Sequence, residues 1–383
     1  MTAAFPDRPR KTTLPLEGLR VIELGSVIAG PFCGSLLADF GACVVKVERP
    51  EGDPGRHLGA SVDGVSVWWG VCVRDKFCVT LDLKDERDRE RLLELVDQAD
   101  VLVENNRAGA LDRLGLGWSG LHRRNPRLIM LSISGFGQDG PLSHAPGFGK
   151  IAEGLSGIVP LTGDPGHVPL HVGFSLADAT ASLFGLMGVI AALWDRDGEG
   201  GEGRQIDLGL YEPLLRLMDV QAAQLQPHGE PALRQGTNDP YGWGAADHDR
   251  RFVSVLCADG AEILVLVDAQ AVSRIVTLTA SDAEPRQALV AWAAQHSSDS
   301  AAAALRETGI EAARVQDGGS LARDPYFRGR GDVAPAALPS GRSLMVPGHL
   351  LRSLSAAELC PFRSASLADD QKLIFADFRE PEN

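Results

Sequence analysis

The fold class is decided by residues 20–47, RVIELGSVIAGPFCGSLLADFGACVVKV, where two short apolar runs flank a longer one. Residues 20–24 and 43–47 have the length and composition of buried strands, and residues 30–40 have the length of a helix. Gly41 follows directly, and glycine is favoured just beyond a helix end. The segment predicts a strand, a helix and a second strand.

The same alternation continues through the first half of the chain. We expect further strands at residues 78–83, 101–103 and 128–132, a charged helix at 84–98 and a short helix at 118–124. Alternation of this kind builds a parallel sheet with helices on both faces, and ligands bind at the carboxyl ends of its strands. The predicted fold class is therefore α/β.

A dinucleotide site is a tempting interpretation of this pattern, but the residues do not support it. The first strand is followed by GSVIAGP, which lacks the G-x-G-x-x-G spacing that lets a backbone approach a pyrophosphate. Glu48, at the end of the second strand, imitates a ribose-binding acid only in its position. Without the glycines we expect no dinucleotide here.

Residues 171–212, HVGFSLADATASLFGLMGVIAALWDRDGEGGEGRQIDLGLYE, contain the most informative carboxylate of the chain. Asp178 starts a long apolar helix, which runs into a glycine-rich loop and a strand at 205–210. Backbone N–H groups at a helix N-terminus should hold such a carboxylate ionised, and an ionised carboxylate can act as a nucleophile toward an acyl group. From spacing alone a simpler interpretation is favoured, because Ser175 and Asp178 fit S-x-x-D, a capping box.

Length and composition limit the classes of protein to consider. A chain of 383 residues exceeds a usual single core and should form about two domains. The formal net charge of −14 disfavours nucleic acid or an anionic membrane as the main partner. We expect a cytoplasmic protein, since no run of about 18 apolar residues suggests a membrane span and residues 1–18 lack a signal core. The six cysteines include no C-x-x-C pair and give no zinc signature.

Beyond residue 220 the composition changes. Residues 221–251 are rich in Gly, Pro, Gln and Asp, which is typical of a linker. Two strands around a turn at 258–260, a helix at 289–308 and a turn or short helix at 323–330 follow. We expect a large domain at residues 1–225, a smaller α+β domain at 226–345 and a C-terminal segment, 346–383, that returns to the large domain.

Five blocks within residues 17–215 occur in an order typical of one enzyme family. They are GLRVIELGSVIAGPFCGSLLADFGACVVKVERPEGDPGR, DKFCVTLDLKD, VLVENNRAGALDRLGLGW, NPRLIMLSISGFGQDGP and SLADATASLFGLMGVIAALWDR. The chain resembles the family III CoA-transferases (CaiB/BaiF family), which include formyl-CoA and crotonobetainyl-CoA transferases and α-methylacyl-CoA racemase. The small domain and C-terminus resemble the family only loosely, through GIEAARV and ARDPYFRGRG. The resemblance implies a Rossmann-like large domain and two interlocked rings forming a homodimer, with residues 366–378 packed on the large domain.

The resemblance also shifts the interpretation of Asp178 from a cap to a nucleophile, because the family has its catalytic aspartate at this position. It implies that the carboxylate attacks an acyl-CoA thioester and expels CoA thiolate, leaving a mixed anhydride. The thiolate then forms an aspartyl-CoA thioester, and an acceptor acid reverses the steps. We therefore expect acyl-CoA and carboxylic acid substrates, and no metal, ATP or redox cofactor.

CoA carries three phosphates, so the resemblance implies cations at its groove even in an acidic chain. Guanidinium groups suit phosphate or the adenine face, and lysine acts as a point charge. A lone surface Arg or Lys is more often only a solvated charge, and Asn105 and Asn106 also suit turns. The aligned positions are Arg49, Lys76 and Arg113 for the phosphates, and Val27, Ile28, Val73, Arg74, Asn105, Asn106, Arg107, Phe148 and Lys150 in the surrounding loops.

Some positions depart from the family. Phe148 replaces the histidine base of the racemase branch and cannot take a proton, while His144 is expected at the surface. Gly149 stands where many relatives have Asp or Tyr, which puts a local contact in doubt. Ile28 stands where some relatives have glutamine, so backbone N–H groups should stabilise an oxyanion. A glycine-rich lid is only weakly suggested, at residues 242–245.

Three functions remain open at this point. The leading one is CoA transfer between two carboxylic acids. The others are a racemase or isomerase that uses the same CoA site with another base, and a CoA-binding subunit without activity.

Overall fold

The computed structural model describes residues 3–6, 14–198, 200–218, 223, 234, 236, 251–349, 351, 353–354 and 370–375. By its internal contacts the chain divides into two compact units. Unit 1 comprises Met1–Ile158, His171–Val220 and Pro325–Asn383, and unit 2 comprises Val159–Leu170 and Gln221–Asp324. The return to unit 1 thus begins at Pro325, earlier than the boundary at 346 that composition suggested.

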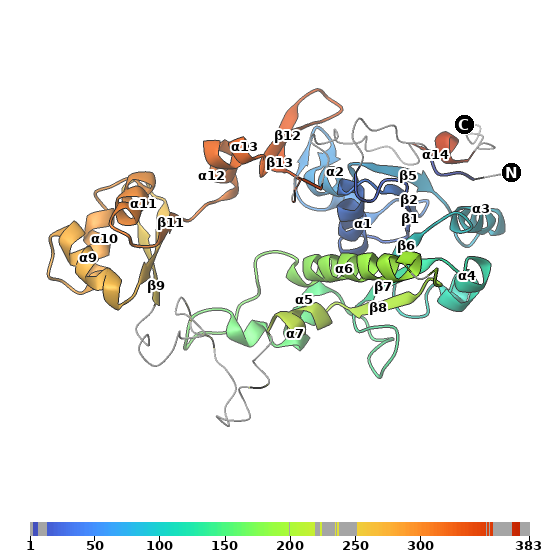
Figure 1. Cartoon of the computed structure of the whole chain (residues 1–383), viewed down its shortest axis with the longest axis horizontal. Helices are drawn as coiled ribbons and strands as arrows, with labels where there is room; N and C mark the ends of the chain where they lie inside the picture. Colours follow the sequence, from blue (N-terminus) through green and yellow to red (C-terminus); the bar gives the residue numbers. More distant parts are fainter. Residues whose placement is uncertain are drawn as a thin grey trace. The chain divides into compact units, whose positions relative to one another are not determined.

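Unit 1 is built on a sheet that has six parallel strands among the described residues (Figure 1). They are β1 (Arg20–Glu23), β2 (Cys43–Glu48), β5 (Lys76–Thr80), β6 (Val101–Glu104), β7 (Ile129–Ser134) and β8 (Gln205–Gly209). Their order is β5-β2-β1-β6-β7-β8, and each neighbouring pair is parallel. The predicted α/β fold class is confirmed, although β5 begins two residues before its expected start at 78.

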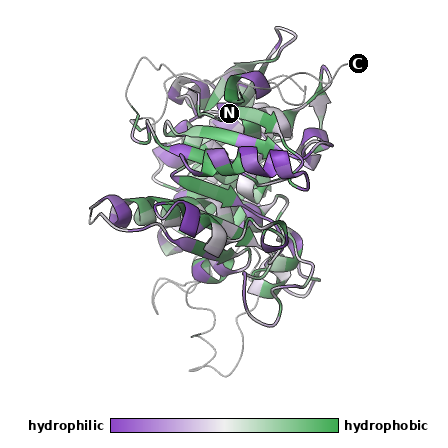
Figure 2. Ribbon diagram, turned by 90° about the vertical axis from the view of Figure 1, so that its right-hand side faces the viewer, coloured by the Kyte–Doolittle hydropathy of each residue, from purple (hydrophilic) through white to green (hydrophobic). Residues whose placement is uncertain are grey.

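Helices cover both faces of this sheet. They are α1 (Ala29–Asp39) and α6 (Leu176–Gly198) on one face, and α3 (Glu86–Val96) and α4 (Trp118–Arg124) on the other. Val21 and Val101 pack against the first pair, while the next residues along the strands, Ile22 and Leu102, pack against the second pair. Figure 2 shows the central strands in green and many purple residues on the surrounding helices. Burial on both faces explains why the strands are continuous apolar runs.

Helix α6 is long and apolar enough to cross a membrane by length and composition alone. The core helix of a folded domain passes the same test, and α6 packs against α1, β7 and β8. Leu183, Met187, Ile190 and Trp194 are exposed on it, at the i, i+4, i+7 and i+11 spacing of one helix face. We call these four residues the α6 stripe.

The remaining elements of unit 1 lie mainly at the strand ends and in the C-terminal part. They are η1 (Pro54–His57), β3 (Ser61–Val62), β4 (Val65–Ser66), α2 (Val67–Val73), η2 (Asp112–Leu114), α5 (Gly149–Ser156), α7 (Glu212–Leu217), α13 (Pro325–Arg330), β12 (Val333–Ala337), β13 (Ser343–Pro347) and α14 (Gln371–Ile374). The β12–β13 hairpin packs Ala336 and Val346 on Val65, which is why the chain joins unit 1 before residue 346.

The C-terminal segment contacts the edge of the sheet at β5. The Asp370 carboxylate accepts a hydrogen bond from the Cys78 amide, and the Gln371 side chain makes two hydrogen bonds with the backbone of Thr80. Of the segment 366–378 that was expected to pack on the large domain, residues 370–375 are described and do so.

Unit 2 contains an antiparallel sheet in the order β11-β10-β9, with helices against it. Its elements are η3 (Val159–Leu161), β9 (Arg251–Leu256), β10 (Glu262–Val267), α9 (Ala269–Thr279), α10 (Pro285–Ala293), α11 (Ser298–Glu307), β11 (Ala312–Arg314) and α12 (Gly318–Arg323). The single helix expected at 289–308 is wrong, because α10 ends at Ala293 and the Ser297 side chain caps α11. Most of the linker at 221–251, and all of the weak lid candidate at 242–245, lies outside the described residues.

Unit 1 buries two lysines inside its sheet. Lys46 and Lys76 contact the Glu23 carboxylate at 2.8 and 2.7 Å, and Lys46 also contacts Asp53 at 2.8 Å. The two positive and two negative charges of this buried quartet cancel. Although burial raises the pKa of Glu23, the two lysines together hold it below its usual range. The quartet therefore satisfies charges that are rarely buried unless paired.

Replacing Glu23 by Gln should lower the free energy of unfolding by about 3–5 kcal/mol, because two buried ammonium groups lose their shared carboxylate. The loss should be full at pH 7 and shrink as the pH falls through the lowered pKa of Glu23, since the carboxylate stabilises the fold only while ionised. Urea unfolding followed by circular dichroism measures both effects. The control Glu90→Gln removes an exposed carboxylate 3.3 Å from Arg124 and should cost less than about 0.5 kcal/mol. Equal losses in the two variants would contradict the role of the quartet.

Candidate active site

A cavity of about 390 Å³ lies at the carboxyl ends of β1, β6 and β7, where a parallel sheet is expected to bind its ligand. Asp178 reaches it from the first turn of α6, and Gly149 lies beside it at the start of α5. The other lining residues are Ser26, Val27, Ile28, Ala29, Asn105, Ile133, Ser134, Gly135, Gly147, Phe148, Lys150, Ser175 and Leu210. Five positions selected from the sequence, Val27, Ile28, Asn105, Phe148 and Lys150, thus share one cavity with Asp178.

The environment of Asp178 raises the pKa of its carboxyl to about 6. Burial is the largest cause, and the Glu153 carboxylate adds to it, while the residue's own amide and Lys150 act in the opposite direction. The N–H group thus acts in the expected direction, but the loss of water outweighs it and leaves the pKa above the usual range of an aspartate. At pH 7 a carboxyl with this pKa is still mostly ionised, and it is a stronger base than an exposed aspartate.

The capping alternative gains no support from the described residues. No hydrogen bond links the Asp178 amide to the Ser175 side chain there, and the Ser175 carbonyl instead accepts from the Ala179 amide. Both side chains line the cavity. The geometry therefore leaves the Asp178 carboxylate to the cavity rather than to a capping box.

Gly149 leaves room for Asp178. A Cβ atom built on Gly149 would overlap Oδ2 of Asp178, so a side chain at 149 would displace the carboxylate. The absence of a side chain at 149, which put a local contact in doubt, allows the first turn of α5 to approach Asp178. The preceding residue, Phe148, is extended and 66% exposed at the cavity wall.

A buried carboxylate that the sequence analysis missed lies close to Asp178. Glu153 on α5 is fully buried, accepts hydrogen bonds from Lys150 Nζ at 2.8 and 3.0 Å, and lies 3.2 Å from His171 Nδ1. Lys150 also donates to the carbonyls of Val172 and Phe174, which precede α6. The ammonium group of Lys150 therefore binds other groups of the protein and positions the segment that precedes α6. The periodicity arguments did not predict α5, so no signal marked Glu153.

The loop after β1 is held in an uncommon conformation at the cavity wall. Val27 has a φ of +65°, which β-branched residues rarely adopt. The Asp53 carboxylate accepts a hydrogen bond from the Val27 amide at 3.0 Å, and Trp68 Nε1 donates to the Val27 carbonyl at 3.1 Å. The Asn105 side chain bonds both backbone groups of Ser26. These bonds maintain the loop against its local backbone preference.

Two further cavities are linked to this one in series through shared lining residues. A cavity of about 270 Å³ shares Ser26 with the first and is lined by Arg49 and Asn106. A third, of about 390 Å³, shares two residues with the second and is lined by Arg107 and the exposed His144. We call the three cavities the strand-end groove. Arg113 is exposed near its far end, since a Cβ built on Gly109 of that wall would lie 3.6 Å from the guanidinium.

Three residues expected at the CoA groove do not line these cavities. Val73 and Lys76 are fully buried, and Arg74 is nearly so. Lys76 donates to the Glu23 carboxylate and the Pro31 carbonyl, and Arg74 donates to the Pro347 carbonyl. The assignment of Lys76 to a phosphate is therefore corrected: its ammonium group is used inside the sheet.

Comparisons with known proteins identify the family. The sequence matches the profile of CoA-transferase family III over residues 16–361. The chain belongs to this family. It is 36% identical over 338 residues to succinyl-CoA–D-citramalate CoA-transferase of Chloroflexus aurantiacus, covering 83% of each chain.

Other relatives of this family III enzyme match over shorter lengths. Acetyl-CoA:oxalate CoA-transferase of Acetobacter aceti is 40% identical over 243 residues, which is 63% of this chain and 61% of that one. This chain therefore spans only about six tenths of the length of several relatives that it matches. A solved CaiB/BaiF family protein from Brucella suis has a TM-score of 0.81 and 30% identity, with 96% of this chain and 100% of that one covered. The family resemblance inferred from the five sequence blocks is confirmed.

Replacing Gly149 by Ala should lower kcat about 100-fold, because the methyl group would push the Asp178 carboxylate away from its position. Steady-state kinetics of CoA transfer measures the loss, while the melting temperature should change little. Gly154→Ala is the matched control on the same helix, since a Cβ there meets no atom within 4 Å. Full activity of Gly149→Ala would show that the close approach is not required.

Proposed function

We propose that this family III enzyme transfers coenzyme A from an acyl-CoA to a free carboxylic acid through covalent intermediates on Asp178. The observation that carries the proposal is the Asp178 carboxylate itself. It is half-buried at the strand-end groove, mostly ionised at pH 7, and more basic than an exposed aspartate.

The reaction exchanges one nucleophile for one leaving group at every step. A carboxylate oxygen of Asp178 attacks the thioester carbonyl, the C–S bond breaks, and CoA leaves as thiolate. The thiolate then attacks Cγ of Asp178, the anhydride C–O bond breaks, and the first acid leaves as a carboxylate. The acceptor carboxylate attacks the resulting aspartyl-CoA thioester, and the same steps run in reverse. The balance needs neither water nor an electron carrier, and CoA is substrate rather than cofactor.

The start of α5 could stabilise the tetrahedral oxyanions that form at each attack on a carbonyl. Its unpaired N-terminal N–H groups begin at Gly149, which lies against the Asp178 carboxylate. Donors of this kind stabilise charge that develops on a carbonyl oxygen. Some relatives have a glutamine at the position of Ile28. In this chain, the N–H groups at the start of α5 would stabilise the oxyanion instead.

The arginines along the strand-end groove suggest how CoA binds. Arg49 and Arg107 line its second and third cavities, and Arg113 is exposed near its end. These guanidinium groups would contact the phosphates, with Asn106 in the same wall. The reacting thioester would then lie in the first cavity beside Asp178, between Ile28 and Phe148.

The names of the relatives support short dicarboxylic acids as substrates. They include enzymes named for succinyl-CoA with D-citramalate and for acetyl-CoA with oxalate. We propose a small dicarboxylic acid as at least one member of the acid pair, in a cytoplasmic homodimer. The four exposed apolar residues of the α6 stripe support the homodimer, because a second copy of the chain could pack on them.

Incubation with an acyl-CoA and hydroxylamine should convert Asp178 to a hydroxamate, because the activated carbonyl of the anhydride or thioester is attacked by the amine. Peptide mass spectrometry locates the modification, with a panel that includes succinyl-CoA and acetyl-CoA. Asp178→Asn should abolish both labelling and transfer. Asp195→Asn, at the other end of the same helix, should keep both. CoA binding without labelling across the panel would favour the isomerase or the inactive subunit instead.

The rate of transfer should fall as the pH drops below about 6, because the nucleophile is the ionised form of Asp178. Glu153→Gln should move this midpoint to lower pH, since it removes a negative charge that raises the pKa of Asp178 and leaves Lys150 in place. The pH profile of kcat/KM measures the shift. A midpoint that stays fixed or rises in Glu153→Gln would contradict this assignment.

A further inference from the structure

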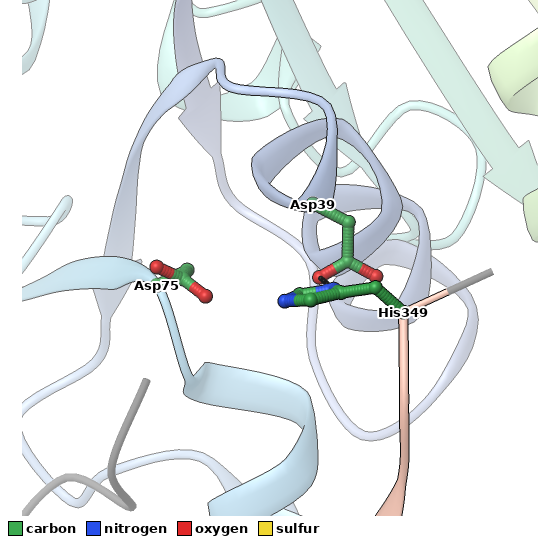
Figure 3. A group of neighbouring side chains, drawn as sticks. All are labelled: Asp39, Asp75 and His349. Carbon is green, nitrogen blue, oxygen red and sulfur yellow. Dashed lines mark ion pairs between the residues drawn. The ribbon is translucent and has the colours of Figure 1, made fainter. Parts of the chain in front are cut away.

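Three potential metal ligands meet at one place in unit 1, where the C-terminal part of the chain packs on it (Figure 3). Asp39 is the last residue of α1, Asp75 lies between α2 and β5, and His349 follows β13. One ligand atom from each lies within 4.8 Å of the other two. Figure 3 shows the imidazole edge directed between the two carboxylates.

The histidine of this cluster is buried without a hydrogen bond. Its side chain is 4% exposed, and neither ring nitrogen has a hydrogen-bond partner. Nδ1 lies 3.0 Å from Oδ1 of Asp39, but that oxygen also lacks a hydrogen bond. Buried polar groups are nearly always satisfied, so an imidazole of this kind points to a missing ligand.

The cluster contains two carboxylates, and one guanidinium group lies close to it. Asp39 and Asp75 contribute two negative charges, and the Arg74 guanidinium lies 4.0 Å from Asp39 Oδ2. Arg74 also donates a hydrogen bond to the carbonyl of Pro347, two residues before His349.

We propose that Asp39, Asp75 and His349 bind one divalent ion of borderline softness, such as Zn²⁺ or Co²⁺. An imidazole nitrogen with two carboxylate oxygens suits such ions, whereas Mg²⁺ and Ca²⁺ prefer oxygen ligands alone. Ligand atoms about 2.0–2.2 Å from one ion lie closer together than 4.8 Å, so the side chains would close in by about 1 Å.

The ion has a structural role that is separate from CoA transfer. Helix α1 starts at Ala29 in the wall of the Asp178 cavity and ends at Asp39, so its length of about 15 Å separates the two sites. The ion joins the end of α1, the turn before β5 and the segment after β13. It therefore fastens the C-terminal part of the chain to the sheet.

The test titrates Co²⁺ into full-length protein that has been stripped with EDTA and dialysed. We expect one equivalent to bind, with visible d–d absorption and no thiolate charge-transfer band. The melting temperature should rise by about 5 °C at one hundred times Kd. His349→Gln and Asp39→Asn should each weaken Co²⁺ binding at least tenfold, and CoA transfer by metal-free wild-type protein should be retained at low temperature.

The control is His122→Gln, which removes a partly buried histidine on α4 and should leave Co²⁺ binding unchanged. If the site variants do not fold, X-ray absorption on the wild-type Co²⁺ complex should still report imidazole and carboxylate ligands. Absence of stoichiometric binding to the wild type, or unchanged affinity in a folded His349→Gln, overturns the proposal. A metal-free protein that loses stability as the His349 imidazole deprotonates also overturns the proposal. That result would show that a protonated imidazole, and not a metal ion, pairs with the two carboxylates.

Discussion

The buried quartet of Glu23, Lys46, Lys76 and Asp53 is the constraint on which the geometry of unit 1 depends. Its members come from β1, β2, β5 and the loop after β2, so pairing their charges fixes these segments against one another. Asp53 extends the effect, because the carboxylate that contacts Lys46 also accepts from the amide of Val27. The wall of the reaction cavity is thus attached to the charge balance of the sheet.

Two carboxylates of the same unit show how burial produces opposite chemistry. Glu23 has two cationic partners, and its pKa is lowered although burial alone would raise it. Asp178 has no ion pair among the described residues, and burial raises its pKa to about 6. The first carboxylate is inert and holds the sheet together, and the second keeps the basicity that a nucleophile needs.

The sequence was sufficient where one local pattern determines one local structure. Apolar runs located the strands, and the helix at 118–124 was predicted at the residues where the structure has α4. Lys76 was misassigned because the family resemblance implied a phosphate-binding cation at this position, and no local signal shows that its partner is Glu23, 53 residues away. Glu153 and the Asp39–Asp75–His349 cluster were missed for the same reason, since only the folded chain brings their partners together. The break between α10 and α11 shows the reverse case, where the local cap at Ser297 outweighs a run of alanines.

The chemistry proposed for Asp178 imposes a requirement on the surroundings of the cavity. A mixed anhydride and an aspartyl thioester are both open to hydrolysis, so water must be kept from the cavity while they exist. Phe148 is 66% exposed in the cavity wall, and Phe174, whose carbonyl binds Lys150 just before α6, is 57% exposed. Apolar side chains left uncovered beside a water-sensitive site indicate that something packs on them. The α6 stripe presents a second such surface, on the helix that carries Asp178. A second copy of the chain that covers both would exclude water and bury the stripe in one step, so the proposed homodimer serves the reaction and not only the stability of the fold.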